Sequence, residues 1–132
     1  MPRVEEASHQ RVVVVTGAST GIGRATTLLL LEKGYKVYAG LRSAADAESL
    51  MSEAGAAAQR LRILELDVTN EEQTAGAARL VNQELNGGHF HGLVNNAGIA
   101  VAGPMEFLPL DDLRLQFEVN VIGQVGLAQA FM

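Results

Sequence analysis

Short apolar runs alternate along the chain with segments whose apolar residues recur at helical spacing. Val12 to Val15 is an unbroken run of β-branched residues, which is typical of a strand covered on both faces. Further runs at residues 35–39, 61–66 and 92–95 predict three more strands. The stretches between them favour helices: one from the loop at 16–23 to Gly34, one capped by Ser43 and running to about Ala57, and one opened by the capping-box pair Thr69 and Glu72. This alternation predicts βαβ units, a parallel sheet and an α/β fold.

A fourth helix is predicted from about Leu110 to the last residue, and it has an unusual end. Its apolar residues still accumulate between Val121 and Phe131, and no glycine cap, basic turn or polar tail precedes Met132. We therefore expect the sequence to be truncated. We expect residues 1–10 to be a disordered tail and residues 11–132 to form an incomplete domain.

Composition excludes several classes of function. The 132 residues carry a formal net charge of −5, so there is no basic surface to follow a nucleic acid. Cysteine is absent, and the His89–His91 pair has no carboxylate cluster beside it, so we expect no metal site. The start of the chain is polar, unlike a signal peptide, and the longest aliphatic stretch covers only residues 28–31. A cytoplasmic protein without a membrane segment is expected.

A glycine-rich loop, TGASTGIG at residues 16–23, lies between the first predicted strand and the first predicted helix. Glycines at 17, 21 and 23 remove side chains that would keep a pyrophosphate from the backbone, and the helix start offers free amides to that phosphate. The spacing departs from G-x-G-x-x-G, and no Gly-Lys-Ser/Thr ending of an ATP-binding loop follows. An ordinary glycine-rich turn is the alternative.

Four motifs in this order resemble those of the short-chain dehydrogenase/reductase family. They are the TGxxxGxG loop, the pair Asp67-Val68 after the third strand, NNAG at residues 95–98 after the fourth, and Asn120 within FEVNVIG. The resemblance covers the chain from Arg11 onward. It implies a partial doubly wound (Rossmann) sheet of strand order 3-2-1-4, with an NAD(P) cofactor at the carboxyl ends of the strands. The cofactor-binding residues that it implies are Gly17, Ser19, Thr20, Gly21, Ile22, Gly23, Arg42, Asp67, Val68, Asn95, Ala97 and Gly98.

The resemblance also implies a role for several of these residues. Asp67 would accept a hydrogen bond from the adenine amino group, although it could also serve as a helix-entry residue, and Val68 would pack beside the ring. Asn95 would hold neighbouring strands together, and Ala97 and Gly98 would let the ribose pass close to the backbone. In relatives, the residue that matches Asn120 interrupts the helix and holds a water that links the catalytic lysine to solvent.

The end of the second strand indicates which dinucleotide would bind. An acidic residue about 20 positions after the glycine loop would select NAD, whereas Leu41 and Arg42 stand there and favour NADP(H) over NAD(H). A solvated surface arginine is the alternative. Many NADP-preferring relatives carry a second basic residue inside the loop, where this chain has Thr20.

Asn120 is the one member of the family's Asn-Ser-Tyr-Lys catalytic set that this sequence contains. Its neighbours Val119 and Val121 suggest that it is buried. No tyrosine follows Tyr38 and no lysine follows Lys36, so we expect the chain alone to lack the proton donor and to be inactive.

The resemblance implies that the intact enzyme interconverts an alcohol and a ketone or aldehyde as a homo-oligomer. The segments KVYAGLR, GLVNNAGI and GPMEFL look like the hydroxysteroid and retinol dehydrogenase branch. Met105 and Phe107 could border the substrate or cover the sheet. The alternative function is a non-catalytic dinucleotide-binding module or sensor.

Overall fold

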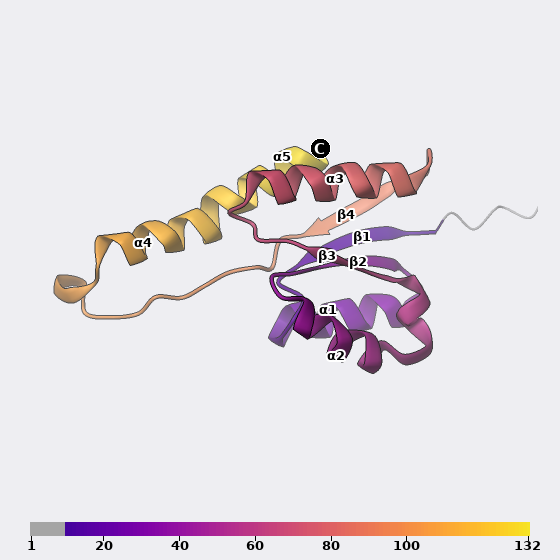
Figure 1. The fold of residues 1–132 in the computed structure, drawn as a ribbon, viewed down its shortest axis with the longest axis horizontal. Coiled ribbons are helices and arrows are strands. Elements are labelled where there is room, and N and C mark those ends of the chain that lie inside the picture. Colours follow the sequence, from indigo (N-terminus) through magenta and orange to yellow (C-terminus); the bar gives the residue numbers. More distant parts are fainter. Residues whose placement is uncertain (1–9) are drawn as a thin grey trace, which may run out of the picture.

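A four-stranded parallel sheet forms the centre of the computed structural model, which describes residues 10–132 (Figure 1). The strand order β3-β2-β1-β4 confirms the predicted one. The tail expected at residues 1–10 lies, except for Gln10, outside the described residues. The strands are β1 (Val12–Thr16), β2 (Lys36–Leu41), β3 (Leu61–Glu65) and β4 (Phe90–Val94).

Helices cover both faces of the sheet (Figure 1). One face carries α1 (Gly21–Glu32), α2 (Ala44–Ala54) and the 3₁₀ helix η1 (Gly55–Arg60). The other carries α3 (Glu71–Leu85) and α5 (Gly123–Phe131). The predicted second helix stops at Ala54 because Gly55 adopts a φ of 55°, from which the chain continues as η1.

The cap of α3 differs from the prediction. Asn70, not Thr69, is the N-cap residue, and its Oδ1 accepts the backbone N–H of Gln73 at 3.0 Å. The hydroxyl of Thr69 donates to Asp67, two residues earlier, so it does not cap the helix.

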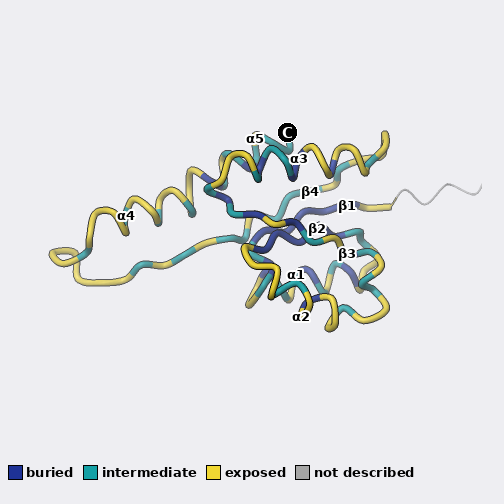
Figure 2. The backbone as a smooth tube through the Cα atoms, viewed as in Figure 1, coloured by how far each residue is buried: buried dark blue, intermediate teal, exposed yellow. Residues whose placement is uncertain are grey.

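Strand β1 is buried on both faces, as its β-branched run predicts. Val12 and Val14 pack in the cluster under α3 and α5, whereas Val13 and Val15 pack in the cluster under α1 and α2. Val14 and Val15 are fully buried, and Figure 2 shows the central strands as the most buried part of the chain.

The C-terminal helical segment is divided where one continuous helix was predicted. It consists of α4 (Leu110–Phe117), a π-helical turn η3 (Glu118–Ile122) and α5, with a short 3₁₀ turn η2 (Met105–Phe107) before it. Helix α4 projects beyond the sheet and is largely exposed (Figure 2). Over residues 10–132, no helix is long and apolar enough to cross a membrane.

Candidate functional site

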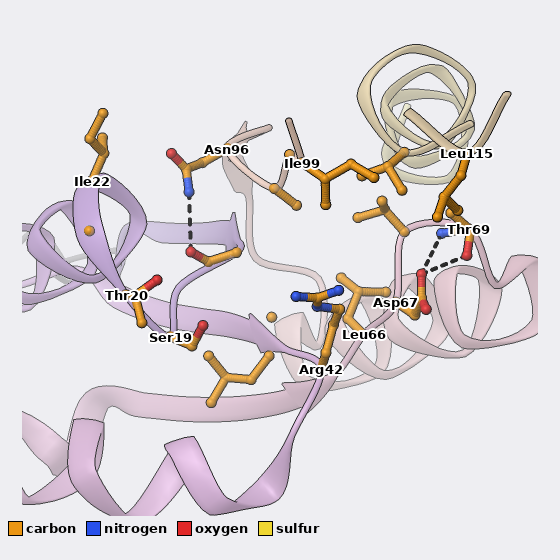
Figure 3. Close-up of a pocket in the computed structure, with 18 residues that line it drawn as sticks. Ser19, Thr20, Ile22, Arg42, Leu66, Asp67, Thr69, Asn96, Ile99 and Leu115 are labelled. Atoms are coloured by element: carbon orange, nitrogen blue, oxygen red, sulfur yellow. Dashed lines mark hydrogen bonds between the residues drawn. The ribbon is translucent and has the colours of Figure 1, made fainter. Parts of the chain in front are cut away.

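A cavity of about 710 Å³ lies at the carboxyl ends of the four strands (Figure 3). This is where an open parallel sheet binds its ligand, and the volume lies within the range of small-molecule sites. Each strand supplies the segment that follows it or its last residues. The lining residues are Gly17, Ser19, Thr20, Gly21, Ile22, Gly40, Leu41, Arg42, Leu66, Asp67, Val68, Thr69, Asn96, Ala97, Gly98, Ile99, Leu115 and Val119. Of the predicted cofactor-binding residues, Gly23 and Asn95 are absent from this lining.

Two glycines of the loop after β1 are required by close backbone approach. A Cβ on Gly23 would lie 2.2 Å from the carbonyl oxygen of Gly17, and one on Gly17 would lie 2.8 Å from Cα of Ala97. Gly17 also adopts a φ of 61°, which a residue with a side chain rarely takes. Gly23 therefore allows the helix start to pack against Gly17, although Gly23 itself does not line the cavity.

The amino-terminal end of α1 faces the cavity and suits an anionic ligand. Thr20 is the N-cap residue, yet its side chain makes no capping hydrogen bond, and the first turn contains no acidic residue. The first amides of the helix have no partner within the helix, and the helix dipole is positive at this end. The cavity thus offers backbone donors where a pyrophosphate would lie.

Asn96, which sequence reasoning did not single out, joins the glycine loop to the segment after β4. Its Nδ2 donates to the backbone oxygens of Thr16 and Gly17, both at 3.1 Å, and Figure 3 draws one amide hydrogen bond of this kind. In return, Thr16 Oγ1 accepts the backbone N–H groups of Asn96 and Ala97 at 3.0 Å.

The strand-bridging role expected for Asn95 is therefore corrected. Its Nδ2 donates instead to the backbone oxygen of Gln124 in α5, at 3.2 Å. Consecutive residues of an extended segment point to opposite sides, so only one of the two asparagines reaches β1.

Asp67 closes a tight turn after β3. Its Oδ1 accepts the backbone N–H and the hydroxyl of Thr69, at 2.9 and 2.7 Å (Figure 3), and its own N–H donates to Gln73 Oε1. The hydroxyl of Thr69 and then its backbone N–H lower the pKa of Asp67. Burial opposes them, and the positive charge of Arg42 adds a smaller lowering effect than these. Asp67 is thus a charged acceptor at neutral pH.

Arg42 brings the positive charge of the cavity from the end of β2. It is exposed, and Figure 3 shows its guanidinium between the glycine loop and Asp67. The preceding Leu41 is buried among the core residues beside α1 and α2. The position that would hold an acidic ribose ligand is therefore filled by an apolar residue and a cation.

Asn120 lies in the π-helical turn η3, so the helix is interrupted at this residue as the resemblance implied. Its Oδ1 accepts the N–H of Ile99 at 2.9 Å, and its Nδ2 donates to the carbonyl of Ile99 at 2.7 Å. The expected burial is wrong: Asn120 is exposed, as is Val121. Asn120 does not line the cavity itself, but its amide holds Ile99, which does.

The remaining candidates lie elsewhere. Met105 and Phe107 are 86% and 76% exposed, so neither covers the sheet, and neither lines the cavity. His91 Nδ1 accepts the N–H of Val12 at the other end of the sheet. The described part of the chain contains no group of three or more His, Cys, Asp or Glu residues that could hold a metal ion.

Comparison with known proteins matches residues 11–132 to the short chain dehydrogenase family. Retinol dehydrogenase 5 of Mus musculus is 34% identical over 121 residues, which make up 91% of this chain and 37% of that protein. Estradiol 17-beta-dehydrogenase 1 of Rattus norvegicus is 36% identical over 127 residues, or 92% of this chain and 36% of the relative. The crystal structure of NADPH-bound carbonyl reductase from chicken fatty liver is similar at a TM-score of 0.83 and 33% identity, covering 93% of this chain and 50% of the other.

Proposed function

We propose a function for the whole protein from one established fact: this chain belongs to the short-chain dehydrogenase family. The chain spans 37% of retinol dehydrogenase 5, so the activity proposed is that of the protein as a whole. That activity is the NADP(H)-dependent interconversion of an alcohol and a ketone or aldehyde. The names of two relatives, retinol dehydrogenase 5 and estradiol 17-beta-dehydrogenase 1, point to a retinoid or steroid alcohol as the substrate class.

The residues around the cavity fit such a dinucleotide. The unpartnered amides at the start of α1 would hold the pyrophosphate, and the charged Asp67 would accept from the adenine amino group. Ala97 and Gly98 line the cavity with little or no side chain and would let a ribose pass close to the backbone. Gly98 also lets Asn120 approach closely, because a Cβ there would lie 3.3 Å from Asn120 Oδ1. A bound nicotinamide supplies hydride transfer.

The proton donor is assigned to a residue outside these 132. The chain has two tyrosines, Tyr35 and Tyr38, and the structure places both hydroxyls away from the cavity. The Tyr38 hydroxyl donates to Glu84 near the end of α3, and the Tyr35 hydroxyl accepts from Arg11. In this proposal Asn120 fixes Ile99 through both of its amide atoms and holds the water that links the catalytic lysine to solvent.

The observation that carries the NADP(H) preference is Arg42 in place of a carboxylate at the end of β2. Arginine presents a planar fork of donors that matches a 2′-phosphate. One bidentate charged contact is worth roughly 1.5–3 kcal/mol, or about 10- to 100-fold in affinity.

The test is Arg42→Ala in the protein at its full natural length, with the dissociation constants of NADPH and NADH measured by fluorescence titration. We expect NADPH to bind about 10- to 100-fold more weakly and NADH to change less than about 2-fold. Arg79→Ala is the matched control, because Arg79 is an exposed arginine on α3 that does not line the cavity. Equal losses for both dinucleotides would refute the assignment of Arg42. Binding of NADPH without turnover of any alcohol or carbonyl would favour a sensor.

A further inference from the structure

The segment after β4 is fastened to the C-terminal helices at every second residue. Residues 95–101 form neither helix nor strand, yet Asn95, Ala97, Ile99 and Val101 each make a hydrogen bond to this helical segment. The partners of the last three are the amide side chains of Gln124, Asn120 and Gln116, which we call the amide ladder. Its contacts are Gln124 Nε2 to the Ala97 carbonyl at 2.7 Å, Asn120 to both backbone groups of Ile99, and the Val101 N–H to Gln116 Oε1 at 2.6 Å.

The spacing of the ladder follows from the two backbones. Four residues of α-helix advance about 6 Å, and somewhat less through the wider π-helical turn η3 that lies between Gln116 and Gln124. Two residues of extended chain advance about 6.5 Å. Amides at 116, 120 and 124 therefore keep in step with residues 101, 99 and 97, which run in the opposite direction.

Gln124 is a donor at both of its contacts. Its Nε2 donates to the carbonyl of Ala97 and, at 2.9 Å, to the carbonyl of Val119 at the start of η3. Gln116 is an acceptor in the contact with Val101. The same type of side chain is therefore used as a donor at position 124 and as an acceptor at position 116.

The helical segment that carries the amide ladder also lies against the segment after β3. A Cβ on Gly123 would be 2.7 Å from the carbonyl oxygen of Val68, which lines the cavity beside Asp67. A helix in contact with Val68 and hydrogen-bonded to Ala97 and Ile99 sets the spacing between two walls of the cavity.

We propose that Gln124 and Gln116 are positioning residues of the dinucleotide site, a role that rests on the function proposed above. Neither lines the cavity, but the ladder holds Ala97, Gly98 and Ile99, which do. Gln124 fixes the position of Ala97 by donating a hydrogen bond to its carbonyl oxygen. Gln116 fixes the other end of the segment by accepting the N–H of Val101.

The test applies one substitution at three places in the protein at its full natural length. Gln124→Glu sets a carboxylate without hydrogens against two carbonyl oxygens. Gln116→Glu keeps an acceptor for Val101. Gln129→Glu is the matched control, because Gln129 is exposed on α5 and touches neither loop nor cavity.

Two measurements separate local positioning from general damage. Hydrogen–deuterium exchange without cofactor should accelerate at residues 97–101 in Gln124→Glu and stay unchanged at residues 17–23. NADPH affinity by fluorescence should fall about 10-fold in Gln124→Glu, less than about 3-fold in Gln116→Glu, and remain that of the wild type in Gln129→Glu. If Gln124→Glu does not fold, Gln124→Met removes the donor without adding a charge and should give the same exchange pattern with a loss of about 3- to 10-fold.

Each other outcome has a distinct meaning. Exchange and affinity in Gln124→Glu equal to those of Gln129→Glu would overturn the proposal, and so would exchange that accelerates equally at residues 17–23. A wild-type protein that binds neither NADPH nor NADH would overturn the proposed function instead, and the exchange pattern would then decide the ladder alone.

Discussion

Two of the segments that line the cavity, the loop after β1 and the segment after β4, are held by different means. The loop after β1 is held by close packing, because the backbones of Gly17, Gly23 and Ala97 approach to distances that leave no room for a Cβ. The segment after β4 is held by side-chain amides that reach it from a helix, at Asn120 and Gln124. Enlarging a side chain should therefore damage the first loop, whereas removing a donor or an acceptor should damage the second.

Gly23→Ala breaks the packed loop and should have the largest effect. Its Cβ would lie 2.2 Å from the Gly17 oxygen and 2.4 Å from Asn96 Nδ2, so the backbone itself must move. We expect a loss of about 3 kcal/mol or more in the free energy of unfolding, measured by chemical denaturation, together with loss of NADPH binding.

Gly126→Ala is the control for this effect. Gly126 lies in α5, and a Cβ there would meet no atom within 4 Å. Alanine is the better helix former, so this variant should gain about 0.5–1 kcal/mol. Equal stability of the two variants would show that the loop tolerates expansion, and the contrast between the loops would fail.

Asn96→Ala sharpens the comparison where the two loops meet. It removes two hydrogen bonds, to the backbone oxygens of Thr16 and Gly17, and leaves those acceptors without their partner. We expect a loss of about 1–3 kcal/mol in the free energy of unfolding. Asn95→Ala removes one exposed contact to Gln124 and should cost less than about 1 kcal/mol. A larger loss at Asn95 would contradict the assignment of Asn96 as the joining residue.

The strands and the cavity could be predicted because their signals are local. The run Val12 to Val15 fits a strand covered on both faces, and the glycine loop and Asp67 follow strands whose carboxyl ends meet at one edge. The resemblance added the strand order, which the structure confirms.

The joining and positioning residues depend on contacts that are distant in sequence. Asn95 and Asn96 are the same residue type side by side, and only the direction of each side chain at the end of β4 separates their roles. Gln116 and Gln124 stand four residues from Asn120 on either side, but their partners lie 15 and 27 residues away and are brought close by the path of the chain after β4.

The smallest expected effect lies in a charged cluster away from the cavity, formed by side chains of β2, β3 and α3. Glu84 Oε2 accepts from the Tyr38 hydroxyl and from Lys36 Nζ, and Arg62 Nε lies 3.8 Å from it. The hydrogen bond from Tyr38, and then that from Lys36, lower the pKa of Glu84. A lowered carboxyl pKa stabilises the folded state above the unfolded value of about 4.3, and this contribution is lost as the pH falls through the folded pKa.

The wild type should therefore lose more stability than Glu84→Gln as the pH falls from 6 to 3, so the difference in the free energy of unfolding between the two proteins should shrink. Urea denaturation at each pH measures this difference. The difference at pH 6 should stay below about 1 kcal/mol, because the Glu84 side chain is 32% exposed and solvent screens its ion pairs. Glu48→Gln, at an exposed position of α2, gives the control slope. Because this cluster lies away from the cavity, NADPH affinity at neutral pH should change less than about 2-fold. A larger change would mean that this charged cluster and the cavity are coupled through β2.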